Sequence, residues 1–202
     1  MTQPSRIPHD WLQPQWPAPA GVRALCTTRA GGVSTGPCAS LNLGSHVGDD
    51  PSAVQANRQR LQAVVQGATP GARAVFLNQV HGTAVATINP ATPDGTEADA
   101  CVATQPGAVC TIMVADCLPV LLAHGSGAVV GAAHAGWRGL AGKGGVGVLE
   151  AVFERFKALA LSDKALTAIK NEANGMLAAH TMAWLGPCIG PTAFEVGAEV
   201  RE

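Results

Sequence analysis

The chain has 202 residues, of which 47% are hydrophobic and 13% are charged, and its formal net charge is −1. This composition supports a sizeable core and argues against long disordered stretches, and it lacks the basic surplus typical of nucleic-acid-binding proteins. Aromatic residues make up only 4% and tyrosine is absent, which disfavours an aromatic platform for stacking bases. The length predicts a single domain.

The chain also lacks the sequence signals of export and membrane insertion. Residues 1–16 carry prolines and charges without an apolar core segment, so no signal peptide is predicted. The longest apolar candidate, residues 108–130, is interrupted by Asp116, Pro119 and His124 and does not predict a membrane span. The six cysteines form no CxxC pair, which favours reduced thiols and a cytoplasmic location.

The first half of the chain predicts few regular elements. Asp50 or Ser52 is expected to cap a helix that runs through Val64 and Val65, because apolar residues recur there at helical spacing. In chain order, the other expected elements are an extended segment over 1–20, a strand over 22–28, an apolar strand over 74–77 and a strand over 83–88.

The second half alternates buried strands with helices. A helix is predicted over 148–161, with Val148, Val152, Phe156 and Leu159 along one face. The other expected elements are strands over 109–114, 120–123 and 128–133, a helix over 162–179 and a strand over 182–185. Strands and helices mix without a strict βαβ repeat, which favours an α+β fold in one domain, with mixed β-sheet layers and flanking helices.

Three separated residues each offer one metal ligand beside small or glycine residues. His81 precedes a glycine, Cys117 follows Asp116, and His134 begins the run His-Ala-Gly-Trp-Arg-Gly. Two imidazoles and one thiolate can hold zinc and leave a fourth position open, as in a catalytic site. The separations of 36 and 17 positions match no short ligand motif, so the fold would have to bring the three together.

Basic residues near glycines offer anion-binding candidates. Arg138, after His134, supplies a planar fork for an anion, and Arg29 lies in a glycine turn. Lys143 lies among glycines that could cradle phosphate at a helix start, although the P-loop pattern is absent. Arg138 and Arg29 each have a plain alternative as a solvated surface side chain.

Seven ordered segments resemble the YfiH-like family, long labelled multicopper polyphenol oxidase or laccase-domain proteins and associated with purine nucleoside phosphorylase activity. The matching segments cover about residues 20–200 and are Thr27–Ser34, Leu41–Asp50, Asn78–Gly82, Ala98–Ala100, Ala115–Pro119, His134–Gly139 and Leu185–Gly190. Their order makes the resemblance far more specific than any single segment. It predicts residues 21–202 as a YfiH-like catalytic domain that lacks the family's C-terminal end.

The resemblance implies zinc bound by His81, Cys117 and His134. It also implies phosphorolysis of purine nucleosides such as adenosine and inosine, with some adenosine deamination. We assign catalytic roles to three residues and substrate contacts to four more. The catalytic candidates are Asp116, Arg138 and Arg29, and the substrate-binding candidates are Asn42, Asn78, Gln79 and Lys143. The expected partners are a purine nucleoside and phosphate, with no nucleic acid or membrane, and the sequence does not specify an oligomeric state.

Other functions remain open from the residues themselves. One is a metal-free hydrolase with Cys117 as nucleophile and His134 or His81 as base. Another is a copper-dependent polyphenol oxidase, which is disfavoured because six histidines without an HxH pair cannot readily build a trinuclear copper cluster. A third is a nucleoside-binding protein without turnover. The stretch 162–180 fits the family poorly, which is expected to lower activity or stability.

Overall fold

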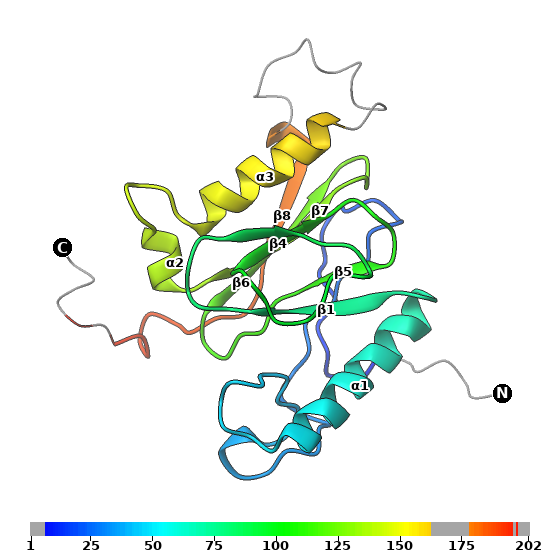
Figure 1. Cartoon of the computed structure of the whole chain (residues 1–202), viewed down its shortest axis with the longest axis vertical. Coiled ribbons are helices and arrows are strands. Elements are labelled where there is room, and N and C mark those ends of the chain that lie inside the picture. Colours follow the sequence, from blue (N-terminus) through cyan, green and yellow to red (C-terminus); the bar gives the residue numbers. More distant parts are fainter. Residues whose placement is uncertain (1–6, 163–177, 196, 198–202) are drawn as a thin grey trace.

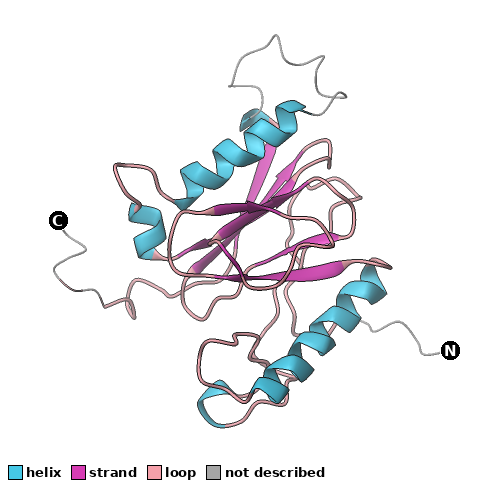
Figure 2. Ribbon diagram, in the orientation of Figure 1, coloured by secondary structure: helices cyan, strands magenta, loops and turns pink. Residues whose placement is uncertain are grey.

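A computed structural model describes residues 7–162, 178–195 and 197 of the chain. Two β-sheets pack face to face, and one long helix covers the outer face of each, so that four layers form (Figures 1 and 2). This arrangement confirms the predicted α+β domain with mixed sheets and flanking helices.

The larger sheet has five strands in the order β2-β4-β7-β6-β8. Only the β2–β4 pair is parallel, and the remaining neighbours are antiparallel. The strands are β2 (Val85–Thr87), β4 (Ala100–Ala103), β6 (Leu118–His124), β7 (Val130–Ala135) and β8 (Thr181–Leu185).

The smaller sheet has three strands, with β1 between two parallel neighbours. Its strands are β1 (Arg73–Asn78), β3 (Thr96–Glu97) and β5 (Ala108–Thr111). Along β1, Ala74 and Phe76 join the cluster beneath the first helix, whereas Val75 and Leu77 join the cluster between the sheets. The period-2 alternation of a strand therefore builds two different cores from one buried segment.

Two long helices close the outer layers. Helix α1 (Pro51–Ala68) is preceded by its N-cap, Asp50. The Asp50 side chain accepts a hydrogen bond from the backbone of Ser52. Helix α3 (Val148–Ser162) buries Val148, Val152, Phe156 and Ala160 against the five-stranded sheet. Two short helices complete the described elements, η1 (Gly36–Cys38) and α2 (Trp137–Ala141).

Several predicted elements differ from the structure. Residues 22–28 form no strand, because only Cys26 finds a bridging partner, Leu12. Strands β3 and β4 and helix α2 were not predicted, and the predicted helix over 162–179 falls largely outside the described residues. No helix in the described ranges is both long enough and apolar enough to cross a bilayer.

Candidate metal centre

Three residues from separate segments meet at one end of the sheet sandwich. His81 follows the end of β1, Cys117 lies directly before β6, and His134 lies near the end of β7. In the antiparallel β6–β7 pair, Pro119 is opposite His134, so the start of β6 brings Cys117 to the end of β7. We call these three residues the His-Cys-His cluster.

The geometry of the His-Cys-His cluster suits one metal ion. Its ligand atoms all lie within 4.8 Å of one another, and Nε2 of His81 lies 3.8 Å from Sγ of Cys117. In a tetrahedral zinc site with ordinary bond lengths, a nitrogen and a sulfur ligand are about 3.5 Å apart. Only a small movement would bring this pair to that separation. His134 is buried and His81 is exposed, so the cluster opens toward solvent on one side.

Asp99, between β3 and β4, forms hydrogen bonds with the ring of His134 and with the backbone around His81. Its side chain is fully buried, and Oδ1 lies 2.9 Å from Nδ1 of His134. The same carboxylate accepts hydrogen bonds from the backbone N–H groups of Val80, His81 and Gly82. Sequence reasoning missed this residue as part of the site. The available signal was an acidic residue between two alanines at the start of a small apolar run.

His81 occupies an unusual backbone conformation. Its φ is +59°, and it is the only non-glycine residue with positive φ among the residues described. A side chain in this left-handed region is strained, and such strain gathers at functional sites. The loop that presents His81 is therefore held in place by its contacts rather than by local preference.

Gly136 lies directly after β7 and close to the side chains of His81 and Cys117. A Cβ at this position would lie 2.8 Å from Cδ2 of His81 and 2.9 Å from Sγ of Cys117. Both separations are shorter than nonbonded carbon contacts allow. Glycine here lets the backbone approach the cluster closely, which explains the absence of a side chain at position 136.

The Cys117 thiol does not ionise easily in the protein without metal. Burial raises its pKa, and the negative charges of Asp116 and Asp99 raise the pKa further. A reactive cysteine nucleophile usually has the opposite environment, with a lowered pKa. A bound cation would reverse the balance by stabilising the thiolate.

The three catalytic candidates lie in different settings. Asp116 is exposed directly beside Cys117. Arg138 is exposed on α2, and its guanidinium stacks 4.3 Å from the ring centre of Trp137. Arg29 donates through Nε to the carbonyl of Ala39 at 2.8 Å, within its own loop. Their roles in a reaction stay predictions.

Two of the substrate-binding candidates already have intramolecular partners. Gln79 exchanges two hydrogen bonds with the backbone of Met113, at 2.7 and 2.8 Å. Asn42 donates to Asp49 and pairs with the backbone of Gly44. By contrast, Asn78 is exposed at the end of β1, and Lys143 is exposed in the turn after α2. All four substrate contacts stay predictions.

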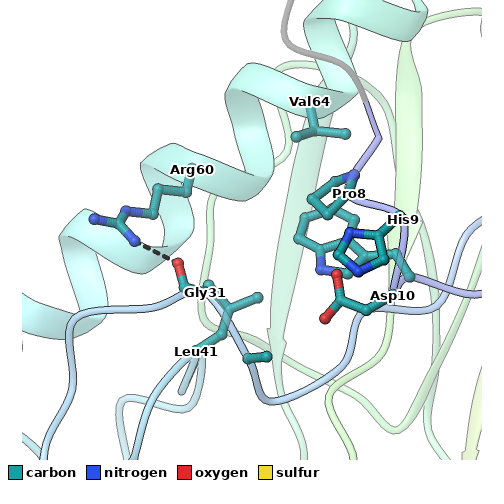
Figure 3. A pocket seen from close by; sticks show the side chains of 9 residues that line it. Pro8, His9, Asp10, Gly31, Leu41, Arg60 and Val64 are labelled. Carbon is teal, nitrogen blue, oxygen red and sulfur yellow. Dashed lines mark hydrogen bonds between the residues drawn. The ribbon is translucent and has the colours of Figure 1, made fainter.

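A separate cavity of about 530 Å³ lies between the N-terminal segment and α1 (Figure 3). Its lining combines apolar residues with Asp10 and Arg60, and it includes no member of the His-Cys-His cluster. Arg60 donates to the carbonyl of Gly31 across one side, as the dashed line in Figure 3 shows. The cavity thus belongs to the packing of α1 rather than to the metal centre.

Relatives named purine nucleoside phosphorylase resemble almost the whole chain. A purine nucleoside phosphorylase of Pseudomonas aeruginosa, PA4543, is 48% identical over 192 residues, covering 95% of this chain and 67% of the relative. Purine nucleoside phosphorylase YfiH of Escherichia coli is 47% identical over 191 residues, covering 95% of this chain and 68% of the relative.

Solved structures share the fold. Protein NMB0706 of Neisseria meningitidis superimposes with a TM-score of 0.73 at 42% identity, covering 95% of this chain and 68% of the other. YlmD of Geobacillus stearothermophilus gives a TM-score of 0.74 at 30% identity, covering 98% of this chain and 69% of the other. These matches confirm the predicted resemblance to YfiH-like proteins. Residues 23–202 also match the family model described as multi-copper polyphenol oxidoreductase laccase, and the chain belongs to this family.

Proposed function

We propose that this chain is a zinc-dependent purine nucleoside phosphorylase that acts on adenosine, inosine and related nucleosides. The observation that carries the proposal is the His-Cys-His cluster, with three ligand atoms within 4.8 Å of one another and one open side. Relatives named purine nucleoside phosphorylase, at 47–48% identity, support an enzyme role. The free thiols of all six cysteines support a reducing compartment such as the cytoplasm.

The residues of the site are proposed to have three separate roles: metal binding, phosphate binding and proton transfer. His81, Cys117 and His134 would hold zinc, which supplies Lewis-acid polarisation of a phosphate or nucleoside oxygen when bound. In phosphorolysis a phosphate oxygen bonds to C1′ of the ribose, while the bond from C1′ to the purine nitrogen breaks. Arg138, which follows His134 by four positions, and Arg29 are proposed to neutralise the phosphate. Asp116 is proposed to carry a proton to the departing purine.

Three other activities have weaker support. The family description favours a test for copper-dependent polyphenol oxidation. However, the His-Cys-His cluster is the only grouping of three or more potential metal ligands within the described ranges. A metal-free cysteine hydrolase is disfavoured because burial and two carboxylates raise the pKa of Cys117. Adenosine deamination at the same centre remains a second proposed activity.

The first experiment compares wild type with Cys117→Ser by elemental mass spectrometry and by purine release. We expect about one zinc per wild-type chain, loss of that zinc in the variant, and purine release from adenosine and inosine only when phosphate is present. Cys26→Ser is the matched control, because Cys26 is also half-buried but lies outside the cluster. It should keep both zinc and activity.

Each of the other possible outcomes would support a different activity. Purine release that is independent of phosphate would overturn phosphorolysis in favour of hydrolysis. Ammonia release from adenosine would identify deamination. Copper instead of zinc, together with oxidation of a polyphenol, would support the oxidase. Activity that survives both chelation and loss of zinc, but not Cys117→Ser, would support the cysteine nucleophile.

A further inference from the structure

One buried carboxylate contacts both histidine segments of the His-Cys-His cluster. Oδ1 of Asp99 accepts from the backbone N–H of His81 at 2.8 Å and lies 2.9 Å from Nδ1 of His134. Oδ2 accepts from the backbone N–H groups of Val80 and Gly82, at 3.1 and 2.7 Å. The side chain has no exposure to solvent, and these four groups are its hydrogen-bond partners among the described residues.

The hydrogen bond between Asp99 and His134 determines which ring nitrogen of His134 has the lone pair. A backbone N–H can only donate, so both carboxylate oxygens act as acceptors. Because a carboxylate has no hydrogen to donate, Nδ1 of His134 is the donor in this contact, and a neutral ring then has its lone pair on Nε2. A neutral imidazole binds metal through such a lone pair. The hydrogen bond therefore selects the tautomer that a metal ligand requires.

The same carboxylate stabilises the strained turn at His81. Three successive N–H groups, from Val80 to Gly82, converge on Asp99, and concave sets of this kind bind anions well. His81 lies in the middle of the set with φ of +59°. Three hydrogen bonds to a charged acceptor can offset the cost of that conformation.

We propose that Asp99 is a positioning residue that sets both imidazoles for metal binding, fixing the tautomer of His134 and the loop conformation of His81. The role in metal affinity rests on the proposed metal centre. The role in tautomer and loop geometry does not, because it concerns the protein without metal. Losing such an outer partner typically lowers metal affinity by about 10–100-fold.

Asp99→Asn is the informative substitution because it keeps the shape and exchanges one acceptor for a donor. If the new amide N–H₂ faces Val80 and Gly82, donors face donors and the His81 loop is pushed out. If it faces His134, Nδ1 must accept and the proton moves to Nε2, which removes the lone pair from the metal side. Either orientation disturbs one histidine.

Asp94→Asn is the matched control. Asp94 also accepts several hydrogen bonds, from Arg73 and from the backbone of Phe76, but it touches no member of the His-Cys-His cluster. This variant measures how far zinc affinity changes when a carboxylate away from the cluster is lost. We expect its zinc affinity to stay within about twofold of wild type.

Two measurements are made on the full chain. Zinc affinity is measured by competition with a chromogenic chelator, and the histidine tautomers of the metal-free protein are read from long-range nitrogen–proton NMR correlations. We expect wild-type His134 to carry its proton on Nδ1. Asp99→Asn should weaken zinc binding about 10–100-fold and should change either the His134 tautomer or the His81 backbone signals.

The outcomes separate the two proposals. A wild-type His134 protonated on Nε2, or a folded Asp99→Asn with unchanged zinc affinity, overturns the role of Asp99. If the variant fails to fold, the wild-type tautomer still decides. A wild type with the expected tautomer but no affinity for zinc or copper supports the positioning of the rings and refutes the metal-dependent function.

Discussion

The two histidines of the candidate centre are presented in opposite ways. His134 lies on β7, is buried, and donates its backbone N–H to the carbonyl of Asp99, the residue before β4. His81 lies on an exposed loop with φ of +59°. A ligand on a strand is placed by the sheet register, whereas a ligand on a strained loop needs a dedicated internal partner. Here that partner is the buried carboxylate of Asp99.

The comparison shows where rigidity in this site comes from. β7 has sheet neighbours on both sides, so its ligand would keep its place without metal. The His81 loop depends on three hydrogen bonds to one side chain. We therefore expect changes near the loop to affect metal binding most strongly, and changes at the strand to affect folding as well.

Gly136→Ala should have the largest effect, because it drives the loop ligand away while the strand ligand stays. The added Cβ would lie 2.8 Å from His81 and 2.9 Å from Cys117, so both must move. We expect zinc affinity, measured by chelator competition, to fall by more than about 100-fold. That is the upper end of the range for losing a residue that hydrogen-bonds to a metal ligand. Overpacking of this kind also costs about 1–3 kcal/mol of stability.

Gly21→Ala is the control for that substitution, because a Cβ there meets nothing within 4 Å and the glycine has no positive φ. It should leave zinc affinity unchanged. If Gly136→Ala bound zinc as tightly as wild type, the close approach at the cluster would have no role in ligand placement.

Replacing each histidine separately should change metal-free stability in opposite directions. His134→Ala removes a buried ring and leaves Asp99 without one donor, which should cost about 2–3 kcal/mol. His81→Gly relieves the left-handed conformation and should stabilise the protein by about 0.5–1 kcal/mol. Chemical denaturation of the metal-free variants measures both. Equal destabilisation by the two substitutions would contradict the comparison of strand and loop.

The smallest expected effect concerns the third ligand. Because the pKa of Cys117 is raised, less thiolate is present at pH 7 than in an ordinary thiol, and alkylation should keep accelerating above pH 9. Asp116→Asn removes one raising charge and should speed alkylation by about 2–5-fold at pH 7. Peptide mass spectrometry after iodoacetamide treatment follows the rate, with Asp94→Asn as control. Faster alkylation of wild type than of a model peptide thiol would restore the cysteine-nucleophile hypothesis.

The helices and longer strands were predictable because their patterns are local. Helix α1 follows from the cap at Asp50 and the spacing of its apolar residues, and α3 follows from the face that includes Val148 and Phe156. Strand β4 was missed because Ala100–Ala103 is only four residues long and buried on both faces, so it has no alternation to detect. The 22–28 segment alternates but lacks a neighbouring strand, which only the tertiary structure decides.

The candidate centre was predictable in its residue types but not in its support. His81, Cys117 and His134 were assigned together through the family resemblance, and the structure places them together. The spacing alone could not pair them, because contacts across two sheets have no sequence signature. Asp99 was missed because its role depends on three backbone amides, and no residue type marks a backbone amide.

Asn57 couples the docking of α1 to the folding of the loop that precedes the helix and includes Val33 and Asn42. The two therefore form in one cooperative event. This fully buried helix residue accepts from the backbone of Val33 and donates to Ser34 and to the carbonyls of Ser40 and Asn42. The loop has no sheet of its own to hold it, so it cannot keep its shape once α1 lifts away. Amide hydrogens of the loop and of α1 should therefore exchange with solvent at one common opening rate, whether or not the His-Cys-His cluster holds a metal.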